Sequence, residues 1–255
     1  MATQTAQAIA LSTFELLELI LLQLDTQTLL TAQRTCQTWH RIIQDSVAIQ
    51  KALFFIPMNP SSASTKVQNA LLAKMFPGFF NSNLTLLAGV DMLQRPEKLE
   101  AYIRPEASWR RMLVQQPPIF RIGILVSCFA FSESYTFYEL STREDGLRME
   151  ELFEAFLFHR DVVGLDNPAA NWWGNTDSPG WRKIEQMTGR TIETDLVISI
   201  LAGSTCTDYD DDWESEDVIL GVRIRGVYQK LNIQPCIPVK ETRLNEWEYS
   251  GWYDD

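Results

Sequence analysis

The first part of the chain carries apolar residues at helical spacing. Apolar residues recur every three or four positions at Leu16, Leu17, Ile20, Leu21 and Leu24. This period predicts an amphipathic helix, and the Ser12-x-x-Glu15 pattern indicates a capping box at its start. Asp25-Thr26 predicts a break and a new helix start, so further short helices are expected over about 27–35, 36–44 and 47–55.

The remainder of the chain alternates between helical and extended patterns. A short helix is expected over 67–76, and the clearest later helix covers 148–158, with an apolar stripe and outward-pointing glutamates. Runs rich in Ile, Val and Phe predict strands over 119–131, 135–140, 195–202 and 218–227. Residues 57–64, which are rich in Pro and Ser, indicate a linker.

These elements predict an α+β fold in two parts. A small all-α, three-helix module is expected over residues 9–55, followed by a linker over 56–64. The α+β C-terminal body would then extend over 65–255, with a mostly antiparallel or mixed sheet. The sequence shows no internal repeat that would indicate another architecture.

Composition and charge narrow the functional classes. Of the 255 residues, 45% are hydrophobic and 22% charged, as in an ordinary folded protein. The formal net charge of −11 disfavours nucleic acid and anionic membrane as partners, because both are bound through cations. The four cysteines are far apart, which is typical of reduced thiols in a cytoplasmic or nuclear protein. No signal peptide or membrane span is expected.

The N-terminal residues also follow the order of a known family. The matching positions are Glu15-Leu16-Leu17, Ile20-Leu21, Leu24, Leu29, Arg34, Cys36 and Trp39. The segment therefore resembles an F-box, although Ser12-Thr13 stands where the family has Leu-Pro and Thr35 where it has Val. The later phrase SWRRML followed by Pro117-Pro118 resembles an element of fungal F-box proteins, and the resemblance implies a fungal source.

The resemblance implies a docking module for a Skp1-type adaptor and, through it, a cullin. The chain would be the substrate-recognition subunit of an SCF-type E3 ubiquitin ligase, without catalysis or cofactors and with an unknown protein substrate. The implied adaptor contacts are Leu11, Leu16, Leu17, Ile20, Leu24, Leu29 and Trp39. A Skp1-bound scaffold outside a ligase and an enzyme in the C-terminal body remain as alternatives.

The supply of apolar residues in the N-terminal segment agrees with docking. A unit of roughly 45 residues buries too little surface for a self-sufficient core, yet almost every second residue of 14–24 is apolar. Either the rest of the chain covers this excess, as in an ordinary globular domain, or another protein does. The expected linker favours another protein.

Three tryptophans in the second half are candidate substrate contacts. Trp172, Trp173 and Trp181 lie in a predicted loop over 167–181, which is rich in Asn, Pro and Gly. Aromatic side chains in loops are common anchors for partners. They also close the ends of hydrophobic cores, and the sequence leaves both interpretations open.

Charged and titratable clusters offer further alternatives. The acidic run 208–217 suits a calcium ion, a basic partner or a solvated loop. His159 is either a general base or a helix-end residue, and the spacing of Cys and His predicts no metal site. The basic cluster Arg104, Arg110 and Arg111 can pair with a phosphate or serve the fold.

Overall fold

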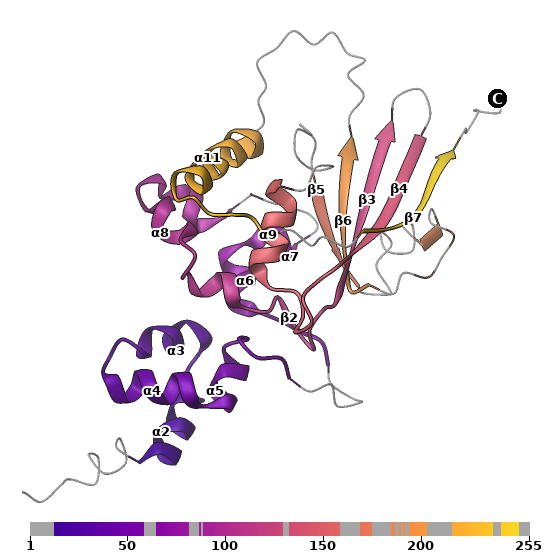
Figure 1. Ribbon diagram of the computed structural model, residues 1–255. Coiled ribbons are helices and arrows are strands. Elements are labelled where there is room, and N and C mark those ends of the chain that lie inside the picture. Colours follow the sequence, from indigo (N-terminus) through magenta and orange to yellow (C-terminus); the bar gives the residue numbers. More distant parts are fainter. Residues whose placement is uncertain are drawn as a thin grey trace, which may run out of the picture.

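The computed structural model describes most of the chain, with gaps in both halves. The described residues are 13–58, 65–81, 87, 89–129, 133–158, 169–174, 185–186, 189, 191, 194–202, 216–236 and 241–249. They form a group of N-terminal helices followed by a body of helices and a sheet (Figure 1). The predicted α+β class is therefore confirmed.

Short helices make up the N-terminal module. They are α2 (Phe14–Leu21), α3 (Thr26–Ala32), α4 (Gln37–Asp45) and α5 (Val47–Ala52). Helix α2 has Thr13 at its N-cap, one residue beyond the predicted Ser12, which lies outside the described residues. The predicted start at Asp25 is confirmed, because its side chain accepts hydrogen bonds from the backbone N–H groups of Gln27 and Thr28, both at 3.0 Å.

The first part of the body consists of short elements that form one side of the core. In chain order these are β1 (Val67–Gln68), α6 (Ala70–Met75), α7 (Pro77–Phe80), η1 (Asp91–Gln94), η2 (Pro96–Lys98), α8 (Leu99–Ile103), η3 (Ser108–Arg111) and β2 (Gln115–Gln116). Strands β1 and β2 form a small antiparallel pair. The helix predicted over 67–76 begins later than expected, because Asn69 caps α6 through the N–H groups of Leu71 and Leu72.

A mixed five-stranded sheet forms the other wall. Its members, in spatial order, are β5 (Ala169–Trp173), β6 (Leu196–Ala202), β3 (Arg121–Phe129), β4 (Glu133–Ser141) and β7 (Glu241–Tyr249). Strands β3 and β6 are parallel, and the other neighbours are antiparallel. Helix α9 (Met149–Phe158) lies between β4 and β6 in the chain, and α11 (Glu216–Lys230) lies between β6 and β7.

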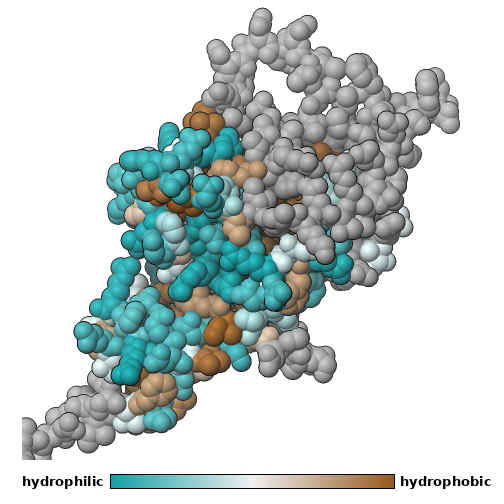
Figure 2. All heavy atoms as spheres, viewed as in Figure 1, coloured by the Kyte–Doolittle hydropathy of each residue, from teal (hydrophilic) through white to brown (hydrophobic). Residues whose placement is uncertain are grey.

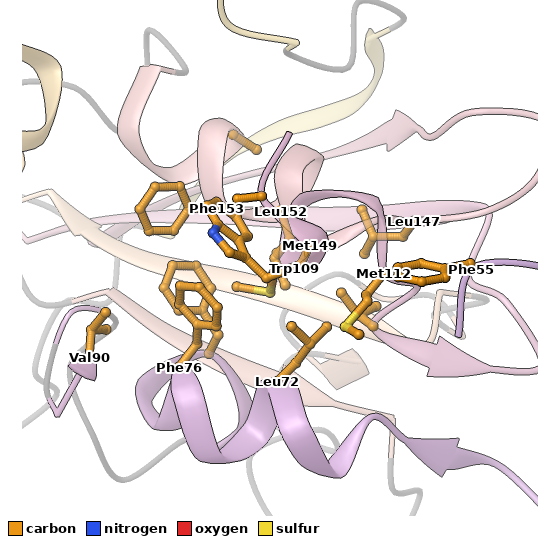
Figure 3. Packing of buried hydrophobic residues seen from close by; sticks show 14 of the residues in the cluster. Phe55, Leu72, Phe76, Val90, Trp109, Met112, Leu147, Met149, Leu152 and Phe153 are labelled. Carbon is orange, nitrogen blue, oxygen red and sulfur yellow. The ribbon is translucent and has the colours of Figure 1, made fainter. Parts of the chain in front are cut away.

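The core is filled between the helices and one face of this sheet. Aromatic rings from α6, η3 and α9 meet at its centre, as Figure 3 shows. The ring centroids of Phe76 and Trp109 are 5.1 Å apart, and those of Trp109 and Phe153 are 5.2 Å apart. Alternate residues of β3, including Ile122 and Ile124, belong to the same buried cluster. This cluster continues into the N-terminal module, so the two parts share one connected core.

One predicted strand in the second half is wrong, and one strand was not predicted. Residues 218–227 were expected as a strand but belong to α11, in which Gly221, Ile224 and Tyr228 are the buried face. The acidic end of the chain, for which no element was expected, includes β7. Local preference for β structure in the Val- and Ile-rich segment is thus overridden by packing of α11 against α8.

The glutamates of α9 also differ from expectation. Glu151 and Glu154 were predicted to point outward, but their exposed fractions are only 2% and 0%. Burial raises the pKa of Glu151, an effect opposed by the Arg148 N–H and the Arg143 guanidinium. Helix α9 is therefore surrounded by protein on nearly every side, and its carboxylates need internal partners.

Those partners form a buried polar network around Arg110, which is 1% exposed. Its guanidinium donates hydrogen bonds to Glu150 at 2.6 and 2.9 Å, to the Tyr228 hydroxyl at 2.9 Å, and to Glu154. The Tyr228 hydroxyl donates to Glu154 at 2.9 Å, and the Cys236 N–H donates to the same carboxylate. The network therefore ties η3, α9 and α11 together.

Burial shifts the proton affinities of this network. It raises the pKa of Glu154, and the Cys236 N–H and the Arg110 charge oppose that shift. Burial likewise raises the pKa of Tyr228, and the neighbouring Glu154 carboxylate acts in the same direction. The basic cluster proposed from sequence is thus divided, because Arg110 is an internal counterion while Arg104 and Arg111 are exposed.

The module is fastened to the body at residues 51–58. The buried Gln116 side chain donates to the carbonyls of Lys51 at 3.0 Å and Ile56 at 3.4 Å, and accepts from the Met58 N–H at 3.0 Å. The Leu113 N–H donates to the Phe54 carbonyl at 2.8 Å. The described start of the predicted linker 56–64 is therefore held against the body. Residues 59–64 lie outside the described part, and the domain boundaries stay a prediction.

Replacing Gln116 by leucine should loosen this junction. The change leaves the Lys51 carbonyl and the Met58 N–H without their side-chain partner, and we expect a loss of about 1–3 kcal/mol in the free energy of unfolding. Hydrogen exchange should accelerate at the Met58 amide. Gln115→Leu is the matched control, because this neighbour makes only long contacts of 3.4 Å to Pro117 and Asp195. Equal stability and exchange in the two variants would contradict the assigned role.

Candidate functional site

Helix α2 carries an exposed apolar stripe. Leu16, Leu19 and Ile20 are 46%, 59% and 44% exposed, and their spacing places them on one side of the helix. Leu17 and Leu21, on the opposite side, are fully buried in the core of the module. A soluble chain seldom leaves such a contiguous apolar surface uncovered, so the stripe is a candidate contact surface for another protein.

The surroundings of the stripe hold α2 in place. The buried Ser46 hydroxyl donates a hydrogen bond to the Glu18 carboxylate and accepts one from the Ile49 N–H at 3.1 Å. Ser46 thus links α2 to the start of α5 while capping it. Val47, the next residue, is 57% exposed and extends the apolar surface of the module.

The Asp25 cap fixes the adjoining helix. The Thr28 hydroxyl and the N–H groups of Thr28 and Gln27 donate to the Asp25 carboxylate, and these hydrogen bonds lower its pKa. The cap is therefore ionised at neutral pH, and it also places a negative charge at the positive end of α3. The α2–α3 turn is consequently set by local interactions that do not require a partner.

Helix α2, which carries the stripe, lies away from the sheet. Figure 1 shows α2 at the end of the module that is farthest from the sheet, whereas α3 and α5 lie nearer to it. In Figure 2, brown and tan atoms interrupt the hydrophilic surface of the module. A partner could therefore cover α2 without displacing the body.

The structure sorts the residues that the F-box resemblance assigned to the adaptor contact. Leu16 and Ile20 are exposed, and Leu24 and Trp39 are half-buried. Leu17 and Leu29 have exposed fractions of 0% and 1%, so they hold the module together and we remove them from the proposed contact. Leu11 lies outside the described residues.

The sequence reasoning missed three exposed apolar residues of the module, which are Phe14, Leu19 and Val47. Leu19 and Val47 are not among the positions that match the F-box family. Those matching positions include residues of the core as well as residues of the contact surface. The helical period does identify Leu19, because it lies between Leu16 and Ile20 on the face opposite Leu17. Val47 has no comparable signal, since its exposure depends on how α5 packs.

The tryptophans proposed as substrate contacts do not lie in a loop as far as the structure describes them. Trp172 and Trp173 belong to strand β5, where they pair with Val197 and Leu196. The half-buried Trp173 stacks on Phe80 at 5.3 Å between ring centroids and donates a hydrogen bond to the Phe79 carbonyl at 3.0 Å. These contacts favour the core-closing interpretation for Trp173. Trp181 lies outside the described residues.

The histidine and acidic candidates do not form a metal site or a catalytic group within the described residues. Within the described segments, no group of three or more His, Cys, Asp or Glu side chains could hold a metal ion. His40 is exposed on α4, and His159 lies outside the described residues, as does residue range 208–215 of the acidic run. No described helix combines the length and apolar character needed to cross a membrane.

Comparison with protein families agrees with this geometry. The family model named F-box-like matches residues 14–55, which are the residues of α2 to α5 and the turn that follows. Comparison with curated proteins and with solved structures gives no match. An F-box-like domain therefore occupies the N-terminal part of the chain, and it carries the exposed α2 stripe.

Proposed function

We propose that the chain is the substrate-recognition subunit of an SCF-type ubiquitin ligase. The observation that carries this proposal is the exposed Leu16–Leu19–Ile20 stripe on an F-box-like domain. In this arrangement a Skp1-type adaptor covers the stripe and connects the chain to a cullin. The body then holds a protein substrate near the ubiquitin-conjugating enzyme and raises its effective concentration there.

The proposed role requires no catalysis by this chain. F-box proteins are typically adaptors, and transfer of ubiquitin would be performed by the other components of the ligase. Binding energy at the adaptor contact would come from a few desolvated apolar anchors rather than from the whole area. The proposal includes a fungal source and a cytoplasmic or nuclear location, where ligases of this class act.

Co-expression with a Skp1-type adaptor tests the proposal. We expect the two proteins to elute together in size-exclusion chromatography as an equimolar complex. Addition of the cullin–RING module and a charged conjugating enzyme should then give ubiquitin transfer that depends on this chain. Separate elution of chain and adaptor would contradict the ligase role, and stable adaptor binding without any dependent transfer would favour a scaffold.

A further inference from the structure

A cleft between the F-box-like domain and the body is the most distinctive surface left without a role. Its volume is about 720 Å³, within the range of roughly 300–1,000 Å³ that is usual for ligand sites. One wall comes from α3 and the turn after it, through Leu30, Thr31 and Arg34, and the opposite wall comes from α6, α8 and η3. The cleft therefore exists only because the two parts of the chain are joined.

The charge of this cleft is opposite to that of the whole chain. Its lining contains Arg34, Lys74, Arg95 and Arg104, and none of the residues that line it is acidic. The chain as a whole has a formal net charge of −11. A local concentration of positive charge in an acidic protein attracts an anionic partner and repels a cationic one.

Three of these cations have no counterion among the residues that the structure describes. No described carboxylate lies within salt-bridge distance of Arg34, Lys74 or Arg104, and all three side chains are exposed. Some exposed cations elsewhere in the described chain are paired, as Lys66 is with Asp195 and Lys230 with Glu100. The charges of Arg34, Lys74 and Arg104 are thus available to a ligand.

The floor of the cleft is apolar and rigid. Trp109 and Met112 are buried beneath it, and the indole N–H of Trp109 donates to the Tyr102 carbonyl at 2.7 Å. Leu71 and Met75 of α6 add partly buried apolar surface. A floor of this kind can receive apolar side chains while the rim pairs with negative charges.

We infer that this cleft binds an acidic segment of a partner protein, in which Asp or Glu residues alternate with apolar residues. The four cations come from four separate segments of the wall, so a ligand with distributed negative charges matches them better than one with a single charged group. The inference rests on the proposed function, since such a segment would be the part of the substrate that is recognised. None of the residues that line the cleft belongs to α2, which carries the stripe proposed for the adaptor.

Fluorescence polarisation with the full chain tests this inference. The probe is a short fluorescein-labelled peptide in which Glu and Asp alternate with Leu and Tyr. The test variant is Lys74→Glu with Arg104→Glu, which should weaken peptide binding by about ten-fold or more. The control is Lys98→Glu with Arg223→Glu, which makes the same change in net charge at exposed cations outside the cleft. Binding by the original chain should also weaken as salt is raised.

Each other outcome contradicts the assignment. If peptide binding weakened equally in the test and control variants, the effect would be one of overall charge. If the original chain did not bind the peptide, the cleft would not be a site for an acidic segment. Stronger binding of a singly phosphorylated, otherwise neutral peptide would replace the acidic segment by a phosphate as the ligand. Tighter peptide binding after Asp210, Asp211 and Asp212 are changed to Asn would show that the chain's own acidic run is the occupant.

The two proposals fail in different ways. If the adaptor does not bind but the acidic peptide binds in the cleft, the ligase role is overturned and the peptide site stands. If the adaptor binds normally and the peptide does not, only the cleft assignment is overturned. Adaptor binding by the Lys74→Glu, Arg104→Glu variant also verifies that this variant is folded.

Discussion

Replacing Leu16 and Ile20 together by glutamate should abolish capture of a Skp1-type adaptor while leaving the chain folded. Both side chains are almost half exposed in the free chain, so charged groups at these positions remain hydrated. In the complex the same groups would be desolvated at the centre of an apolar contact. Anchor residues of this kind commonly contribute 2 kcal/mol or more each, so we expect affinity to fall by roughly a hundred-fold or more.

The control for this prediction is Ile219→Glu with Val222→Glu on α11. These residues are 42% and 57% exposed, so the substitution matches the test variant in chemistry and exposure but lies on the body. Adaptor binding can be measured by isothermal titration calorimetry, and folding by the thermal midpoint. Unchanged binding by the Leu16→Glu, Ile20→Glu variant would remove α2 from the contact.

Leu17→Ala distinguishes the contact from the core. Leu17 is fully buried, and truncation of a buried leucine costs about 2–5 kcal/mol of stability. Loss of adaptor binding in this variant should therefore accompany unfolding of the module, whereas the exposed-face variant should lose binding alone.

The largest effect on stability is expected from Arg110→Met. Methionine has similar length but no charge, so Glu154 would remain buried with only the Tyr228 hydroxyl and the Cys236 N–H as partners. Removal of one member of a buried ion pair typically costs about 3–5 kcal/mol. Because the total stability of a domain is only about 5–15 kcal/mol, the variant should be close to unfolding. Urea denaturation followed by tryptophan fluorescence measures the difference.

The sign of the pH dependence follows from Glu154. Burial already raises its pKa in the folded chain, and Arg110 opposes that rise, so the pKa should be higher still in the variant. A carboxyl group with a raised folded-state pKa favours folding most below its unfolded pKa, and this contribution is lost as the pH rises through the folded pKa. The destabilisation caused by Arg110→Met should consequently grow from acidic to neutral pH.

A second substitution checks that the effect belongs to the ion pair. Adding Glu154→Gln to Arg110→Met removes the uncompensated charge, so much of the lost stability and most of the pH dependence should be recovered. If Arg110→Met alone lowered the free energy of unfolding by less than about 0.5 kcal/mol, the network would not contribute to stability as predicted.

The sequence predicted the module better than the body for a physical reason. The period of Leu16 to Leu24 and the Asp25 cap are local signals, and both correspond to helices in the structure. The strand over 195–202 and the helix over 148–158 are also local and were predicted correctly. In α11, by contrast, β-branched residues favoured a strand locally, and the helix is stabilised by contacts with distant elements such as α8 and α9.

The polar interior of the body could not be predicted from local pattern. Glu151 and Glu154 resemble solvent-facing residues of an amphipathic helix, because their partners Arg143 and Arg110 lie in other elements. The site shows the same limit. The spacing of Leu16, Leu17 and Ile20 indicated a docking helix, but the separation of contact from core required the burial of each side chain. The cationic cleft joins residues from four segments, and no single stretch of sequence reveals it.

Consecutive residues of the 3-10 turn η3 have different roles. Trp109 is part of the floor of the cleft, and Arg110 is the counterion of the buried network. A substitution that reshapes the cleft through this turn will therefore disturb the interior charge balance, and a substitution that relaxes the network will shift the floor. Ligand preference and thermal tolerance cannot be adjusted independently at this point, so new specificities should arise more readily on the rim, at positions such as Lys74 and Arg104.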